Sequence, residues 1–99
     1  MEIRIDGPML VLRGDLDGRS THEVRNAIYG LIARHQVVVI DCTEVTSIDL
    51  TAVKLLVVAT RRAGLGGGQV VLRGCGPTVR RFLYLSHFRR ALELEPVPA

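Results

Sequence analysis

The uninterrupted β-branched run from Val37 to Ile40 constrains the fold of this chain more than any other feature. It lacks the alternation of apolar and polar residues that a half-exposed strand shows. Such a run is typical of a strand that lies centrally in a parallel sheet or is covered on both faces. Parallel strands need a crossover connection, usually a helix. Residues 52–63 have a helical pattern and residues 69–72 form a second apolar run, so the sequence predicts a strand, a helix and a parallel strand.

The crossover helix is predicted from apolar side chains at helical spacing: Val53, Leu56, Val57 and Thr60, with Leu55 and Ala59 beside them. Gly64 is placed as its C-terminal cap. The glycine-rich stretch 64–68 leaves a helix and enters a strand, and no Gly-Lys-Ser/Thr follows it. We therefore interpret it as a flexible connection rather than a phosphate-binding loop.

A hairpin and a helix precede this unit. Glu2 to Ile5 and Met9 to Arg13 are predicted strands, separated by residues typical of a turn. Ser20 and Glu23 fit a capping box, in which each side chain bonds the other's backbone N–H. We expect this box to open a helix from Thr21 to Arg34.

The C-terminal part predicts a third helix that begins at Gly76 and Pro77, because proline is tolerated at the first helical position. Its inner stripe would comprise Val79, Phe82, Leu83 and Ser86. Residues 87–91 form either a short helical turn or a loop, and residues 92–94 can add an edge strand. These patterns predict an α/β fold: a mixed sheet of four to five strands flanked by three to four helices, mainly on one face.

The length of 99 residues favours one domain, residues 1–99, which buries about two thirds of the surface that its unfolded chain exposes. No basic-then-apolar leader opens the chain, and its longest apolar run falls short of the roughly 20 residues that span a bilayer. Cys42 and Cys75 match neither a zinc spacing nor a C-x-x-C pair, which favours free thiols in a reducing compartment. We expect a soluble cytoplasmic protein without membrane insertion, with residues 96–99 as a loose tail.

The net charge of +3 and the pI near 9.4 come mostly from arginines, which occur in pairs at 61–62, 80–81 and 89–90. A partner that carries carboxylates or phosphates is favoured. The excess of 13 basic over 10 acidic residues is modest, however, and the pairs fall beside apolar positions, as on solvated helix faces. A nucleic-acid surface is therefore the less favoured interpretation.

Catalytic and metal-binding patterns are weak in this sequence. The three histidines are scattered without an i, i+4 pair, and there is no Gly-x-Ser-x-Gly elbow. Asp41, Glu44 and Asp49 gather before the crossover helix and in principle suit a hard cation. The favoured alternative is that Asp49 or Ser47 caps this helix while the other carboxylates stay solvated. We expect no enzyme activity, cofactor or metal.

The junction between the Val37–Ile40 strand and the crossover helix is the candidate functional site. It is predicted to run through an acidic turn into the first helical turn, where Thr51 lies. A helix N-terminus offers unpaired N–H groups and a partial positive charge, so negative charge is tolerated there. Thr51 is therefore a candidate phosphorylation site, with an ordinary helix cap as the alternative.

The sequence also resembles a known family, the STAS domains of anti-sigma-factor antagonists. The resemblance rests on the order of elements, the turn Arg13-Gly14-Asp15-Leu16-Asp17, the segment from Val37 to Asp49, and the ending from Leu85 to Leu92. In this family the loop usually reads Asp-Ser-Ser/Thr-Gly, and its second hydroxyl is phosphorylated. This chain reads Asp49-Leu50-Thr51-Ala52, so the acidic residue and the acceptor are kept.

The resemblance implies a bacterial anti-anti-sigma factor. It would bind an anti-sigma factor, a serine/threonine kinase of the histidine-kinase-like ATPase fold, and thereby release a sigma factor for transcription. Phosphorylation at Thr51 would end this binding. The implied partner-binding residues are Asp17, Ser47, Asp49, Leu50, Thr51, Ala52 and Lys54. The oligomeric state is left open.

Two departures from the family pattern bear on partner binding. Ala52 adds a methyl group where a partner's backbone would come close, and Leu50 either strengthens docking or tucks into the core. An alternative function is therefore a STAS scaffold or transporter-associated module that is not phosphorylated. A nucleic-acid-binding module is a further, less favoured alternative.

Overall fold

The computed structural model describes residues 1–95, and the tail expected at residues 96–99 lies outside this part. Within residues 1–95 the chain forms a five-stranded sheet in the order β1-β2-β3-β4-β5. β1 is antiparallel to β2, and the other neighbouring pairs are parallel. The predicted mixed sheet, its hairpin and its C-terminal edge strand are confirmed. The strands are β1 (Glu2–Asp6), β2 (Met9–Leu16), β3 (Val37–Ile48), β4 (Gln69–Arg73) and β5 (Glu93–Leu94).

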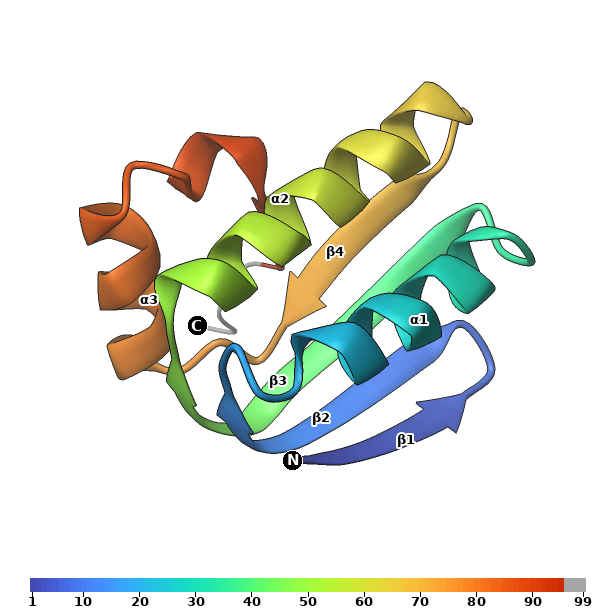
Figure 1. Ribbon diagram of the computed structural model, residues 1–99. Helices are drawn as coiled ribbons and strands as arrows, with labels where there is room; N and C mark the ends of the chain where they lie inside the picture. The colour runs from blue at the N-terminus through green and yellow to red at the C-terminus, as the bar shows by residue number, and fades with distance from the viewer. Residues whose placement is uncertain (96–99) are drawn as a thin grey trace.

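The helices of the described residues are α1 (Thr21–Ile32), α2 (Leu50–Leu65), α3 (Pro77–Leu85) and the short 3-10 helix η1 (Arg89–Ala91). Successive parallel strands are added in one direction across the sheet, so right-handed crossovers place their helices on the same face. Figure 1 shows α1 and α2 side by side in front of the sheet, with α3 at one end of it. The expectation of helices mainly on one face is confirmed.

β3 is the central strand and pairs in parallel with both β2 and β4. Its alternate residues Val38, Ile40 and Cys42 are buried, whereas Val37 remains 45% exposed. The central position is therefore confirmed, but the strand is not covered on both faces.

The acidic turn predicted after Ile40 is wrong, because β3 continues to Ile48. β2 extends to Leu16 and supplies hydrogen-bonding partners along this stretch, with Leu16 opposite Ile48. Irregularities in the register beside Gly14 accommodate the extension. Polar residues in this part of β3 occupy exposed positions of the strand and do not mark a turn.

The capping box predicted for α1 is also wrong. Ser20 has helical backbone angles, and its hydroxyl donates to the carbonyl oxygen of Asp17 at 3.1 Å instead of accepting from Glu23. The same hydroxyl accepts from the Asp17 N–H at 3.3 Å. Ser20 thus closes the turn before α1, and the helix ends at Ile32, two residues earlier than predicted.

α2 is longer than predicted, running from Leu50 to Leu65. Gly64 lies inside the helix, and Gly66 takes the C-terminal cap position. The connection to β4 must contain a glycine at position 68, since a Cβ there would lie 2.6 Å from the carbonyl oxygen of Gln36. The glycine-rich stretch is thus an αβ connection, as predicted, and it packs tightly against the loop before β3.

The core lies between the sheet and its helices and fixes the orientation of α2. The predicted stripe of α2 is buried through Val53, Leu56 and Val57. α3 begins at Gly76 and Pro77 as predicted, with Val79 and Leu83 buried. The largest fully buried side chains are Leu10, Leu12, Leu16, Ile28, Ile40, Leu56, Leu72 and Leu83. Burial of each such side chain contributes about 1.5–3 kcal/mol.

Candidate functional site

Two chain segments meet at the end of the sheet where β2 and β3 finish. β2 and β3 are parallel neighbours, so the turn after β2 and the junction after β3 lie side by side. The backbone N–H of Asp49 donates to the carbonyl oxygen of Leu16 at 3.2 Å, which extends the pairing to the first residue after β3. The fold thereby places the start of α2 against the turn that leads into α1.

Asp49 joins the two segments through its side chain. One carboxylate oxygen, Oδ1, accepts from the backbone N–H of Ala52 at 2.9 Å and caps α2. The other, Oδ2, accepts from the N–H of Gly18 at 3.1 Å. The predicted alternative in which Asp49 or Ser47 caps this helix is resolved in favour of Asp49. A single side chain therefore holds the first turn of α2 at a fixed position beside the α1 loop.

Thr51 is exposed and is the second residue of α2. Thr51 thus lies in the first turn of the helix, while its role as a phosphorylation site stays a prediction. The residue opens onto a groove of about 480 Å³ between α1 and α2. The groove is lined by Thr21, His22, Arg25, Tyr29, Thr51, Lys54, Leu55 and Val58.

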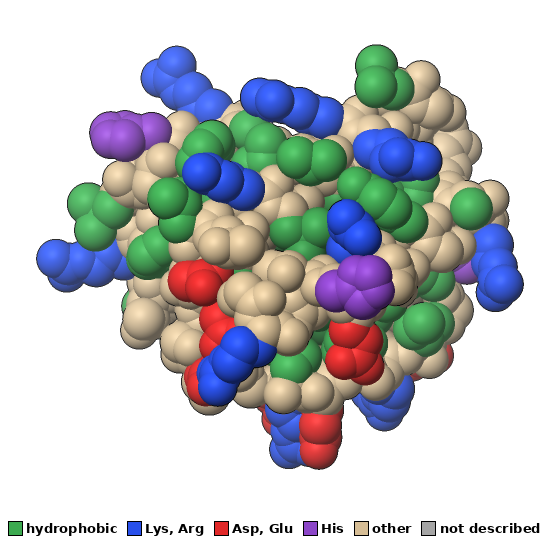
Figure 2. All heavy atoms as spheres, viewed as in Figure 1, with side chains coloured by type: hydrophobic (Ala, Val, Ile, Leu, Met, Phe, Trp, Pro, Cys, Tyr) green, Lys and Arg blue, Asp and Glu red, His purple; other side chains and the backbone are tan. Residues whose placement is uncertain are grey.

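The groove combines an apolar surface with positive charge. Leu55 and the 52%-exposed Val58 contribute apolar surface, and Arg25 and Lys54 contribute charge. Farther along α2, the Arg62 guanidinium stacks over the Tyr29 ring at 4.6 Å from its centroid and links the two helices. Figure 2 shows basic side chains spread around apolar ones over α1 and α2, with acidic side chains toward the lower part of this face. The groove is therefore suited to an anionic or mixed anionic and apolar ligand.

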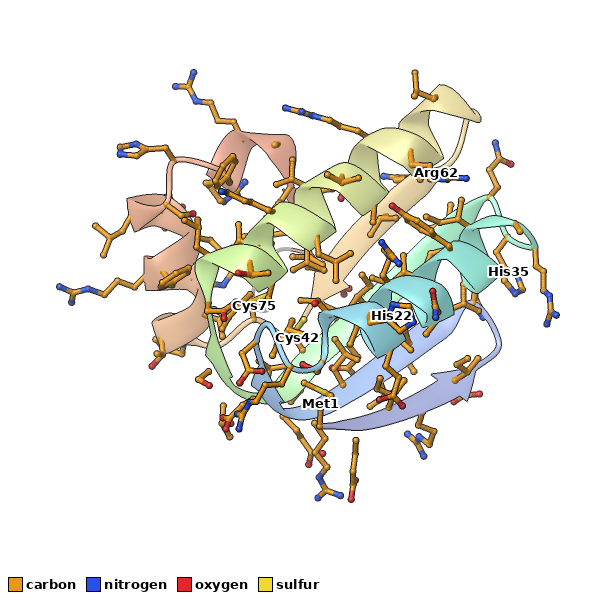
Figure 3. The ribbon with its side chains drawn as sticks, in the orientation of Figure 1. Met1, His22, His35, Cys42, Arg62 and Cys75 are labelled. Carbon is orange, nitrogen blue, oxygen red and sulfur yellow. The ribbon has the colours of Figure 1, made fainter. Side chains whose placement is uncertain are left out.

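His22 lies at the rim of the groove on α1 (Figure 3). Its Nδ1 is 3.3 Å from a guanidinium nitrogen of Arg25, and its Nε2 is 3.3 Å from the side-chain nitrogen of Asn26. Arg25 can only donate, so Nδ1 accepts in this arrangement. This contact joins two of the side chains that line the groove.

Of the implied partner-binding residues, Ser47 lies near the end of β3 and Asp17 in the turn after β2, and both form hydrogen bonds within the protein. Ser47 and Thr46 each donate a hydroxyl hydrogen bond to Asp15 at 2.8 Å, and these bonds lower the pKa of Asp15. Asp17 pairs with the Arg19 guanidinium at 2.6 Å, which lowers the pKa of Asp17. The carboxylates of Asp15 and Asp17 therefore stay ionised, and their hydrogen bonds order the rim of the site.

The remaining implied residues divide into exposed and buried ones. Leu50 is 43% exposed and Lys54 is exposed beside Thr51. Ala52 is fully buried, so its methyl group packs in the core and does not face a partner. The expectation that this methyl would meet a partner's backbone is therefore corrected. Leu50 does not tuck into the core and keeps much of its apolar surface in solvent.

The carboxylates considered as a cation site are not brought together. Asp41 accepts hydrogen bonds from the N–H and hydroxyl of Thr43, and Glu44 forms an ion pair with Arg13 at 2.9 Å. Asp49 is occupied by backbone N–H groups. Among residues 1–95, no three His, Cys, Asp or Glu side chains cluster as metal ligands.

Sequence reasoning missed the contribution of α1 to the site. Thr21, Arg25 and Tyr29 line the groove opposite Thr51. The available signal was the face of α1 outside its apolar stripe, where these residues recur at helical spacing. That face could not be assigned to Thr51 without knowing that α1 and α2 are neighbours.

Comparison with known proteins identifies the family. The STAS domain family model matches residues 1–98, and the chain belongs to this family. No match was found among curated proteins. In the part of the chain that the structure describes, no helix is long and apolar enough to cross a membrane.

Several solved structures share the fold at low sequence identity. An anti-sigma factor antagonist from Mycobacterium paratuberculosis is 20% identical, with 97% of this chain and 84% of that chain covered and a TM-score of 0.77. The Bacillus cell fate determinant SpoIIAA in its phosphorylated form is 18% identical, with coverages of 96% and 90% and a TM-score of 0.68. The protein TM1081 of Thermotoga maritima is 17% identical, with coverages of 97% and 86% and a TM-score of 0.78.

Proposed function

We propose that this protein is an anti-sigma factor antagonist that is switched off by phosphorylation of Thr51. The observation that carries the proposal is the exposed hydroxyl of Thr51 on the first turn of α2, held in place by the Asp49 cap. Membership of the STAS family and the fold shared with anti-sigma factor antagonists support the proposal. In this role the chain is the substrate of a kinase and is not itself an enzyme.

The proposed docking surface is the start of α2 together with the α1–α2 groove. Leu50, Thr51 and Lys54 offer an apolar contact, a hydroxyl and a positive charge on adjacent exposed positions. Asp17, Ser47 and Asp49 form the rim that orders this surface, while Ala52 supports it from the core. The proposed partner is an anti-sigma factor with the histidine-kinase-like ATPase fold, and its binding to this surface releases a sigma factor.

The proposed switch is electrostatic. The Thr51 hydroxyl oxygen attacks the γ-phosphorus of ATP bound to the kinase, ADP leaves, and the hydroxyl proton passes to a base of the kinase. The product carries roughly two negative charges at the centre of the docking surface and close to the Asp49 carboxylate. Burial of these charges against the partner incurs a desolvation cost and repulsion, so the complex dissociates.

The free protein tolerates the phosphate because its surroundings are positive. Thr51 lies at the N-terminal, positive end of the α2 dipole, and Lys54 and Arg25 line the same groove as Thr51. The phosphate therefore adds little strain to the unbound fold while it opposes the complex.

The test is to incubate the purified chain with ATP and anti-sigma factor kinases from its source organism. Intact mass should increase by one phosphoryl group, and peptide mapping should place the group on Thr51. Thr51→Ala should remain unmodified. Thr78→Ala is the matched control, because Thr78 is the exposed second residue of α3 and should not affect modification.

Binding to the same kinases provides the second readout. Thr51→Glu should weaken binding by about tenfold or more, since it places a charge inside the interface. The alternative scaffold or transporter-associated role is favoured by Leu50 and Ala52, which replace the family's hydroxyl and glycine. It predicts partner binding without phosphoryl transfer, and unchanged binding by Thr51→Glu.

A nucleic-acid-binding role predicts instead an affinity for DNA or RNA that falls steeply with salt.

A further inference from the structure

The two cysteines, far apart in sequence, meet in the fold. Cys42 lies on β3 and Cys75 follows β4, and both are buried, with 3% and 5% of their surfaces exposed. Figure 3 shows them close to one another at the same end of the sheet. Both thiols are free in this structure.

The parallel pairing of β3 and β4 brings the two residues together. Asp41 is the register partner of Arg73, so Cys42 continues the pairing beside Gly74. In a regular strand Cys75 would then point to the face opposite Cys42. Gly74 has a φ of +73°, which turns the chain, and Cys75 instead becomes buried on the helix side with Cys42.

The approach between the backbones is close. A Cβ on Gly74 would overlap the Thr43 hydroxyl and lie 3.2 Å from the Cα of Thr43. Neighbouring strands of a sheet lie about 4.8 Å apart, so β3 and the chain that leaves β4 run close beside one another here. This close approach brings Cys42 and Cys75 together at the same end of the sheet (Figure 3).

The surroundings of the two thiols shift their pKa values in opposite directions. Their mutual interaction raises the pKa of Cys42 well above its ordinary value, with burial adding to the effect. The same interaction lowers the pKa of Cys75, assisted by the positive charges of Arg80 and Arg89 and opposed by burial and by Asp41. Arg80 also donates to the carbonyl oxygen of Cys75 at 3.0 Å. These directions, together with the contact from Arg80, favour Cys75 as the thiol that ionises first.

We propose that Cys42 and Cys75 form a dithiol site that peroxides oxidise to an intramolecular disulfide. The Cys75 thiolate attacks one oxygen of hydrogen peroxide, the O–O bond breaks, and the departing hydroxide takes a proton to become water. The resulting sulfenic acid is attacked by the Cys42 sulfur, which loses its proton as a second water leaves. In sum, two thiols and one peroxide give one disulfide and two waters. This site is independent of the proposed role of Thr51.

The experiment treats the folded full-length chain with hydrogen peroxide and measures its intact mass after thiol alkylation in denaturant. The expected product is a monomer that has lost two hydrogen atoms, takes up no alkylating reagent, and yields a Cys42–Cys75 linked peptide. The same chain unfolded in urea should form this disulfide more slowly, because its sulfurs are no longer held together. Alkylatable thiols after treatment, crosslinks between chains, or an equal rate in urea would each overturn the proposal.

Variants assign the roles of the two thiols. Cys42→Ser should stop at the sulfenic acid of Cys75, which dimedone traps. Arg80→Gln should move the pH profile of Cys75 oxidation to higher pH, because a charge that favours the thiolate is removed. Arg81→Gln, at the exposed neighbouring position of α3, is the matched control and should leave the profile unchanged. A profile that is equally unaffected by Arg80→Gln contradicts the assignment of Cys75 as the nucleophile.

Discussion

Asp49 shows how one side chain can organise a functional surface. Its two carboxylate oxygens accept from the N–H groups of Ala52, in the first turn of α2, and of Gly18, in the turn before α1. The first bond fixes where α2 begins, and the second fixes where that helix lies relative to α1. Because Thr51 lies only two residues beyond Asp49, these two bonds also fix the position of Thr51 on the surface.

Asp49→Ala should therefore destabilise the protein by about 1–2 kcal/mol, because it removes the cap of α2 and leaves the Gly18 N–H without its acceptor. Urea denaturation followed by circular dichroism measures the change. Asp49→Ser is the matched control, since a shorter hydroxyl can still cap α2 but cannot reach Gly18 as well. Its loss should be smaller, and equal losses for the two variants would contradict the dual role.

In α2 and the glycine-rich connection after it, glycines at different positions differ in whether a side chain could replace them. Gly64 lies within the helix with open space where a Cβ would stand. Gly68 lies against the carbonyl oxygen of Gln36 and cannot accept a side chain without backbone movement. The two positions are four residues apart, yet only one of them requires glycine.

Substitution of these two glycines by alanine should have opposite effects. Gly64→Ala should stabilise the protein by up to about 1 kcal/mol, because alanine has the higher helix propensity and meets no neighbour. Gly68→Ala should destabilise it, because the new Cβ would lie 2.6 Å from the Gln36 oxygen. Thermal unfolding of the two variants beside the wild type distinguishes the effects. Changes of the same sign would show that the connection is looser than the structure indicates.

Across the molecule as a whole, charge is divided along the chain. From Leu50 to Leu92 the sequence contains no Asp or Glu, and this stretch supplies eight basic residues: Lys54, Arg61, Arg62, Arg73, Arg80, Arg81, Arg89 and Arg90. It includes α2, β4 and α3, whereas most carboxylates precede Leu50. The surface around α2 is therefore basic, and we propose that the partner presents an acidic surface to it.

This charge distribution predicts a salt-dependent complex. Affinity for the anti-sigma factor should fall as ionic strength rises, and Lys54→Glu should weaken binding by about tenfold at low salt. Arg4→Glu makes the same change of charge on an exposed position of β1 and is the control for net charge. Isothermal titration calorimetry at two salt concentrations measures both. An equal effect of the two variants would indicate a general charge effect and remove the basic docking surface.

Much of the fold could be predicted from local patterns. Several elements are specified by residues that lie close together in the sequence. Examples are the strand at Val37–Ile40, the helix with apolar spacing through Val53 and Leu56, and the helix that starts at Gly76-Pro77. The position of Thr51 at an exposed helix start was predicted in the same way. The extension of β3 to Ile48 was not, because its polar residues are paired by β2, a strand more than twenty residues earlier in the sequence.

The sequence by itself determined the kinds of elements, their order and the identity of the candidate acceptor, since side-chain periodicity and turn residues act over short distances along the chain. Only the tertiary structure decided which residues become neighbours across the sheet and between helices. Asp49 meets Gly18, Thr51 faces α1, and Cys42 lies beside Cys75 because parallel strands align segments that the sequence separates. Local sequence patterns do not specify that alignment, because it arises only when the elements pack around a common core.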